Sequence, residues 1–252
     1  MNSDYKNASS FRYLFTNTEY SDLPSLTRAL AACWDEGKNE LFTGALAEYF
    51  TSIDKDLAKI ALQAADAYRA APQDADWIFL DFLFRADDTF DVIYCKEKPY
   101  PNSKALGREI LQALDSGDYS ECRYLGGILR TSILKKHKKR LLREARSAKA
   151  EAILEQAGNP ASVDKRTHIL NAYLLGYYLA EEISFRVDGR TVKTISQLTQ
   201  YMKSLLDVSY ETLEKFCHTL IDYNDVLDVR LEAFLLALGK REELTAWKNS
   251  LK

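Results

Sequence analysis

The sequence predicts an all-α fold, and three observations support this prediction. The chain has 252 residues, of which only 10 are Gly and 5 are Pro, and a scarcity of breakers favours long helices over turn-rich β structure. Apolar residues recur every three or four positions along most of the chain, which is the period of a helix with one buried face. A pattern of positions near the start of the chain also recurs near its end. We therefore expect a helical array of two related three-helix modules joined by a long basic central helix, with one minor β-hairpin.

The recurrence suggests an internal duplication. Phe11-Arg12 matches Phe185-Arg186, the matches from Leu26 to Leu41 follow at a shift of 172 residues, and those from Leu46 onward follow at a shift of 174 after two extra residues in the second copy. The matched pairs are Leu26 with Leu198, Leu30 with Met202, Leu41 with Leu213, Leu46 with Leu220, Asp54 with Asp228, and Leu57 with Leu231. Any two amphipathic helices can slide into partial register, but helical periodicity does not require the Phe-Arg pair or the Asp. We expect residues 11–68 and 185–238 to form similar three-helix units with these apolar residues buried.

The first half is expected to be helical after a short extended segment at residues 11–15. The expected helices run from Asp22 to Trp34, from about Asn39 to Thr51, from Asp54 to Pro72, and from Lys104 to Leu114. Asp22 and Asp54 are suitable N-caps, and Pro24 suits a first turn. The apolar run Ile78–Phe84 fits either a buried helix or a strand, and its helical neighbourhood favours a helix.

The second half is separated from the first by a glycine and a proline. A long helix is expected from about Tyr119 to Gln156, with a break near Gly126-Gly127 as the alternative, and Gly158 and Pro160 end it. This predicts an N-terminal half at residues 1–157, which includes the basic helix, and a C-terminal half at residues 158–252. The expected elements of the second half are an aromatic-rich helix from Ser162 to Glu182, a hairpin with an Asp-Gly turn at Phe185–Val192, and three further helices.

The central segment holds the only marked charge imbalance. Between Ile128 and Ala150 there are nine Lys or Arg residues and one acid, Glu144, while the net charge of the whole chain is −3. The candidate binding face consists of Lys135, Lys136, Lys138, Lys139, Arg140 and Arg143. Such a helix could contact nucleic-acid phosphates or an anionic membrane surface. It could equally be the solvated face of a packed helix, because no aromatic residues are interleaved to stack on bases and the chain is acidic overall.

Chemical motifs are weak. The three histidines (His137, His168 and His218) are far apart in sequence, and Cys217 and His218 are adjacent, so they point in different directions on a helix. No Gly-rich phosphate loop, nucleophile elbow or zinc-binding helix is found. The run Asp87-Asp88-x-x-Asp91 resembles a metal loop, but the Gly and distal Glu of an EF-hand are missing, which favours a solvated turn. We predict no catalytic residues, no metal and no cofactor.

Composition limits the possible environment. No apolar run approaches the roughly 20 residues of a membrane span, and the first residues lack the apolar stretch of a signal peptide. The four cysteines form no CxxC pair, which favours reduced, mostly buried thiols. We therefore expect a cytoplasmic protein without a membrane span.

Two phrases carry a resemblance to known proteins. The segments from Leu26 to Leu46 and from Leu231 to Trp247 are similar to helical accessory modules of bacterial multidomain regulatory proteins with kinase-like or chaperone-like partners. The similarity covers parts of both ends of the chain and supplies no catalytic residue. It implies a binding or regulatory module.

These observations predict a non-enzymatic adaptor or regulatory subunit in a bacterial cytosolic system, with a protein partner. The first alternative is a nucleic-acid-associated protein that binds through the basic helix at residues 130–149. The second is an enzyme of unknown reaction, because catalytic sites are often assembled from distant positions.

Overall fold

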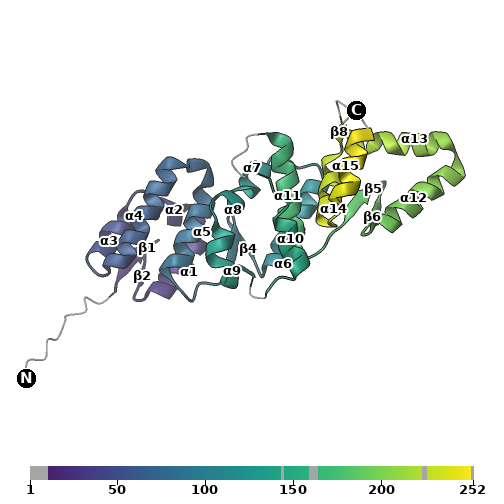
Figure 1. Cartoon of the computed structure of the whole chain (residues 1–252). Helices are drawn as coiled ribbons and strands as arrows, with labels where there is room; N and C mark the ends of the chain where they lie inside the picture. Colours follow the sequence, from purple (N-terminus) through teal and green to yellow (C-terminus); the bar gives the residue numbers. More distant parts are fainter. Residues whose placement is uncertain (1–10, 143–144, 159–163, 223–225, 251–252) are drawn as a thin grey trace, which may run out of the picture. The chain divides into compact units, whose positions relative to one another are not determined.

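The computed structural model describes residues 11–142, 145–158, 164–222 and 226–250. Helices make up most of this part of the chain, and its strands pair as two-stranded antiparallel hairpins (Figure 1). The prediction of a helical fold is confirmed at this level. Four strand pairs are present where the sequence predicted one hairpin.

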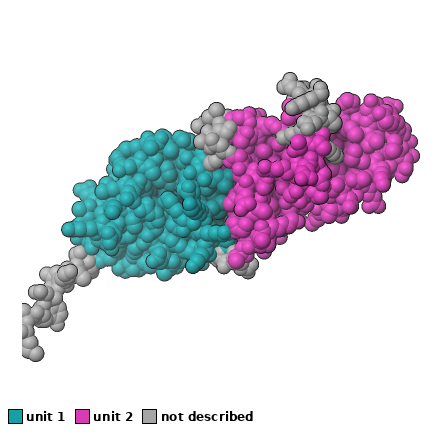
Figure 2. All heavy atoms as spheres, in the orientation of Figure 1, with its two compact units in different colours: residues 1–102, 127–143 teal, residues 103–126, 144–252 magenta. Residues whose placement is uncertain are grey.

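The chain forms two compact units that alternate along the sequence (Figure 2). Unit 1 comprises residues 1–102 and 127–143, and unit 2 comprises residues 103–126 and 144–252. The predicted division between residues 157 and 158 falls inside unit 2, and Pro160 lies outside the described residues. That division concerned two related halves and not compact units, so it stays a prediction.

Unit 1 is built on a nearly all-apolar helix, α5 (Ala75–Ala86), in which eight residues are buried. The expected helical state of the Ile78–Phe84 run is therefore confirmed. The other elements of unit 1 are β1 (Tyr13–Phe15), β2 (Thr18–Tyr20), α1 (Leu23–Ala32), α2 (Trp34–Phe42), α3 (Ala45–Thr51), α4 (Lys55–Ala70), the 3₁₀ turn η1 (Pro72–Asp74), β3 (Ile93–Cys95), β4 (Lys98–Tyr100), α8 (Gly127–Arg130) and α9 (Ile133–Leu142). Asp22 and Asp54 cap α1 and α4 as predicted, each accepting from backbone N–H groups of the first turn.

Unit 2 is centred on α11 (Lys165–Ala180), which packs against α6 (Ser103–Asp115) and α14 (Val229–Ala237). Gly107 and Gly176 allow the close approach of α6 and α11, because a Cβ at either position would meet the other helix. The remaining elements are α7 (Cys122–Leu125), α10 (Ala148–Leu154), β5 (Phe185–Val187), β6 (Arg190–Val192), α12 (Ile195–Val208), α13 (Tyr210–Thr219), β7 (Ile221–Asp222), β8 (Val226–Leu227) and α15 (Arg241–Ser250).

A hairpin followed by a helix occurs three times with the same layout. The hairpins β1–β2, β3–β4 and β5–β6 each have two three-residue strands joined by two turn residues, and two residues separate each hairpin from α1, α6 or α12. The third hairpin is the predicted one. Its turn residues Asp188 and Gly189 both have positive φ, which is the conformation that Asp-Gly favours in a two-residue turn.

The predicted helix from Tyr119 to Gln156 is not continuous, and its first break lies at the predicted alternative near Gly126-Gly127, because α7 ends at Leu125 and α8 begins at Gly127. Four shorter helices, α7, α8, α9 and α10, cover this segment, so the basic central helix is reduced to the ten residues of α9. Gly127 packs where a Cβ would meet the Trp77 ring, and Ser132 adopts a φ of 59° between α8 and α9. Ser147 then caps a separate helix, α10. The apolar spacing is helical within each piece, so it did not reveal the breaks before and after α9.

The two segments proposed as copies agree only in part. Asp54 and Asp228 both cap a helix, α4 and α14, by accepting from the N–H groups two and three residues later. However, the first segment has four helices, α1 to α4, whereas β7 and β8 occupy the place of α3 in the second. The matched residues that are buried are Leu26, Leu30, Leu41, Leu46, Leu198, Leu220 and Leu231, and those that are half-buried are Leu57, Met202 and Leu213. The duplication and its three-helix modules stay predictions.

No helix in the described part of the chain combines the length and the apolar character needed to cross a bilayer.

Candidate functional site

The predicted basic face lies on α9 of unit 1, and burial divides its residues into two groups. Ile133, Leu134, His137, Leu141 and Leu142 are buried and attach the helix to the unit. The backbone at His137 leaves helical values, with φ −116° and ψ 23°, so α9 bends at its centre. Four residues of the predicted face are exposed around this bend. Lys136 is one of them and pairs with Asp81, and the other three form what we call the lysine face: Lys135, Lys138 and Lys139.

Arg140 has a structural role. Its guanidinium donates to the backbone carbonyl of Phe84 and, at 3.0 Å, to that of Asp87, and it lies 5.1 Å from the centre of the Phe84 ring. These carbonyls are at the C-terminal end of α5, where helical partners are missing and a cation is favourable. Arg140 therefore holds α9 to α5, and it is not available as part of a binding face.

His137 is the second anchor. Its Nε2 lies 2.7 Å from Oδ1 of Asp81, and its ring stacks on Phe84 with the centroids 5.1 Å apart. Lys136, although exposed, forms an ion pair of 3.2 Å with the other carboxylate oxygen of Asp81. Burial raises the pKa of Asp81, but the hydrogen bond to His137 and the charge of Lys136 outweigh this effect, so its pKa lies below the usual value.

Two more basic residues of the segment are outside the lysine face. Arg143 lies outside the described residues. Arg146 belongs to unit 2, where its side chain is only 1% exposed, pairs with Glu181 at 3.3 Å and contacts the Ser103 hydroxyl. Of the six predicted binding residues, the three of the lysine face are therefore the ones that we consider as an exposed binding surface.

A pocket of about 360 Å³ lies beside α9 in unit 1. Its lining residues are Gln63, Ala64, Ala67, Ala71, Asp74, Ile78, Asp81, Arg85, Arg130, Thr131 and Lys136. The charges within it are already paired: Arg130 with Asp74 at 2.5 Å, and Lys136 with Asp81. Because these cations have acidic partners, the pocket offers an anion little uncompensated charge.

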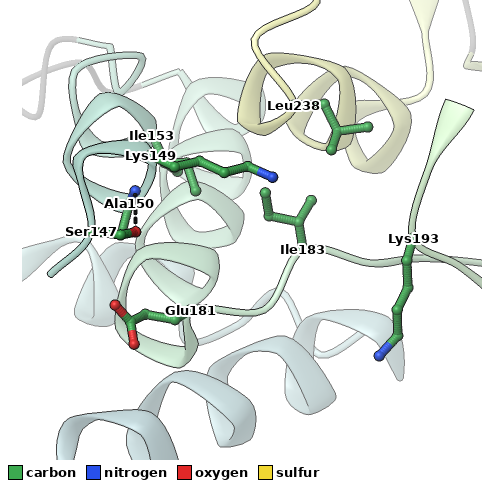
Figure 3. Close-up of a pocket in the computed structure, with 8 residues that line it drawn as sticks. All are labelled: Ser147, Lys149, Ala150, Ile153, Glu181, Ile183, Lys193 and Leu238. Carbon is green, nitrogen blue, oxygen red and sulfur yellow. Dashed lines mark hydrogen bonds between the residues drawn. The ribbon is translucent and has the colours of Figure 1, made fainter.

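A smaller pocket of about 150 Å³ lies in unit 2 (Figure 3). Ile153, Ile183 and Leu238 provide its apolar part, and the other lining residues are Ser147, Lys149, Ala150, Glu181 and Lys193. Ligand pockets usually enclose about 300 Å³ or more, so this one is small for an organic ligand. Glu181 is also engaged by Lys104 at 3.0 Å, and these contacts hold its pKa below the usual value.

The described residues bring few reactive groups together. Cys33, Cys95 and Cys217 are half-buried thiols, and burial raises the pKa of the Cys217 thiol, which lowers its thiolate fraction. No group of three or more His, Cys, Asp or Glu side chains with metal-binding geometry occurs in the described ranges. Asp87, part of the run that resembled a metal loop, accepts instead from Thr27 at 2.8 Å and from Thr89.

Sequence reasoning did not separate the basic residues that anchor α9 to α5 from those that are exposed. It treated residues 135 to 143 as one face, because charge alone does not show which residues meet α5. The available signal was the position of His137 and Arg140, three residues apart and in line with the apolar residues of the same helix.

Comparisons with known protein families, curated proteins and solved structures find no match to this chain. The functional assignment therefore rests on the residues of the chain itself.

Proposed function

We propose that this protein is an interaction adaptor or regulatory subunit of a bacterial cytosolic system, and that its lysine face docks on an acidic surface of a protein partner. The observation that carries the proposal is the contrast within α9. His137 and Arg140 fix the inner side of the helix to α5, while Lys135, Lys138 and Lys139 remain exposed on it.

A fixed helix makes these lysines useful for recognition. Anchoring α9 lowers the entropy lost when a partner binds, and clustered exposed cations speed the encounter with an acidic surface. Each exposed pair contributes little by itself, so the proposal relies on three lysines acting together.

The same lysines support nucleic-acid binding as a second candidate function, because they could equally contact phosphates. The balance favours a protein partner for two reasons. The net charge of −3 opposes approach to a polyanion, and the aromatic ring that contacts α9, Phe84, is buried and cannot stack on a base.

One pair of variants tests both candidates. The face variant carries Lys135→Glu, Lys138→Glu and Lys139→Glu. The control variant carries Lys55→Glu, Lys59→Glu and Lys165→Glu at exposed positions elsewhere, so its net charge changes equally. We expect a specific protein, identified by mass spectrometry, to be captured from native lysate by the wild type and the control and to be lost with the face variant.

Gel-shift titrations at two salt concentrations complete the test. We expect little nucleic-acid binding by the wild type at physiological salt. Tight, salt-sensitive binding that only the face variant loses would assign the lysine face to nucleic acid and contradict the adaptor proposal. Equal protein capture by all three forms would also contradict it.

We also infer that residues 11–68 and 185–238 derive from one duplicated module. The supporting observations are the equivalent caps Asp54 and Asp228 and the common layout of the hairpins at residues 13–20 and 185–192. The replacement of α3 by β7 and β8 is then a local divergence of the second copy.

A further inference from the structure

The helix α12 follows the third hairpin, and it is less covered by other helices than α1 and α6, which follow the first two hairpins. Because α1, α6 and α12 begin at the same distance from their hairpins, their residues can be compared by position in the helix. The fourth position is Leu26, Leu106 or Leu198, and it is buried in all three. Because this residue is buried in each helix, we align α1, α6 and α12 on it.

In both α1 and α6, the helix face beside this leucine is covered by a helix that comes later in the chain. α5 packs on α1, and Asp87 at the end of α5 accepts from the Thr27 hydroxyl of α1 at 2.8 Å. α11 packs on α6, with Gly176 against Ile110. Both covering helices precede the next hairpin in the sequence.

On α12 the corresponding face is open. α1 ends at Ala32, so the twelfth position exists only in α6 and α12, where Leu114 is 0% exposed and Leu206 is 49% exposed. At the eighth position, Leu30 and Ile110 are buried, and Met202 is only half-buried. Within α12 the only buried residue is Leu198, and Figure 1 shows α12 and α13 projecting away from α11 and α14.

Four residues at helical spacing make up this open face of α12: Thr199, Met202, Lys203 and Leu206. Met202 and Leu206 are its apolar members and lie one helical turn apart, where a docked helix could contact both.

We propose that the open face of α12 docks one helix of a partner protein, and that this helix replaces the cover that α5 and α11 give to α1 and α6. Its chemistry follows from those counterparts: a strongly apolar helix with aromatic or aliphatic side chains toward Met202 and Leu206. Lys203 stands where α1 has the buried Ala31, so the docked helix carries an acidic residue opposite it. This proposal concerns unit 2 and does not depend on the lysine face of unit 1.

The chain itself supplies a suitable probe. A fluorescent synthetic peptide of residues 74–88 contains α5, whose Phe79 and Leu83 are buried in the protein and whose Asp residues give it a negative charge. Titrated with the full-length protein, this peptide should show saturable binding by fluorescence anisotropy. A peptide with Phe79→Asp and Leu83→Asp should not bind.

Single substitutions then locate the binding. Leu206→Lys and, as a second variant, Met202→Lys should weaken peptide binding about ten-fold or more, because each removes apolar contact area. Leu62→Lys is the matched control, since Leu62 is 51% exposed on α4 of unit 1, and it should bind as the wild type does. Circular dichroism should show the same unfolding for Leu206→Lys as for the wild type.

Three results would overturn the proposal. These are no binding of the peptide, equal binding by the Leu206→Lys and Leu62→Lys variants, or a concentration-dependent dimer in sedimentation that Leu206→Lys abolishes. The last result would assign the face to a second copy of the chain. The lysine-face variant should bind the peptide normally, so failure of this proposal is distinct from failure of the proposed function.

Discussion

Arg140 and Lys139 are neighbours with the same charge and different roles. Arg140 turns inward and satisfies carbonyls at the end of α5, whereas Lys139 is exposed. A planar guanidinium can donate to two carbonyls at once, which an ammonium on a flexible stem does less well. The two side chains therefore differ in hydrogen-bonding geometry, although a count of charges treats them alike.

Replacing Arg140 should destabilise the protein. Arg140→Ala leaves the carbonyls of Phe84 and Asp87 without this donor and removes the contact with the Phe84 ring, at a cost of about 1–3 kcal/mol. Lys139→Ala should change the free energy of unfolding by no more than about 0.5 kcal/mol. Urea unfolding measures both, and equal effects would contradict the anchoring role of Arg140.

Asp81 should make stability depend on acid pH. Its pKa is lowered in the folded protein from the usual 3.8, because the contacts with His137 and Lys136 outweigh burial. A lowered folded pKa means that the unfolded chain binds the proton more readily, so this contribution is present above pH of about 4 and is lost as the pH falls further. Arg85, 3.9 Å from the same carboxylate, acts in the same direction.

Thermal unfolding of the wild type and of Asp81→Asn between pH 6 and pH 3 checks this contribution. The wild type should be the more stable at pH 6, and the difference should shrink below pH 4. Asp87, whose pKa is also lowered, should leave a residual acid dependence in the variant. A difference that stays constant or grows toward pH 3 would refute the role given to Asp81.

At the scale of elements, buried leucines at matched positions stabilise both segments of the suggested repeat. Leu46 and Leu220 are 0% and 3% exposed, so Leu46→Ala and Leu220→Ala should each cost about 2–5 kcal/mol. Leu62→Ala, at a half-exposed position, should cost less than about 1 kcal/mol. Wild-type stability of either core variant in chemical denaturation would count against the matched register.

Some elements could be predicted from the sequence because a local signal specifies them. Asp22 and Asp54 indicate helix starts, and Asp188-Gly189 indicates a turn. The hairpin β3–β4 has no comparable signal, because its turn holds Lys96 at a φ of 55°, a conformation that lysine rarely adopts. Tertiary packing of the strands determines that turn.

The paired glycines indicated the break near Gly126-Gly127, but the breaks on either side of α9 were beyond sequence reasoning for a related reason. Ser132 adopts a positive φ, and Gly127 is required by the approach of Trp77, a residue far away in sequence. Neither constraint is visible in the apolar period. The six-residue basic face was consequently predicted on one long helix. In the structure, the lysine face on α9 consists of Lys135, Lys138 and Lys139.

At the scale of the whole molecule, the repeated hairpin suggests that its copies are interchangeable. A chimera in which residues 13–20 are replaced by the sequence of residues 185–192 should fold, because strand length, turn length and the distance to the next helix are the same. It should be less stable than the wild type, since the hydrogen bond from Tyr13 to Glu40 is lost.

Circular dichroism during heating tests this chimera. The control carries the same eight residues in scrambled order, which removes the Asp-Gly turn and the alternation of the strands. Cooperative unfolding of the chimera and its absence in the control would support a common module. Two equally disrupted proteins would contradict it.

The central claim is that the lysine face contacts a protein, and site-specific photo-cross-linking in cells tests it most directly. A photoreactive amino acid replaces Lys139 on the lysine face or, as the control, Lys59 on α4, which is also exposed. The account predicts an adduct from position 139 that protease removes and nuclease leaves intact, and no such adduct from position 59. An adduct from position 139 that nuclease removes, or the same protein adduct from both positions, would contradict it.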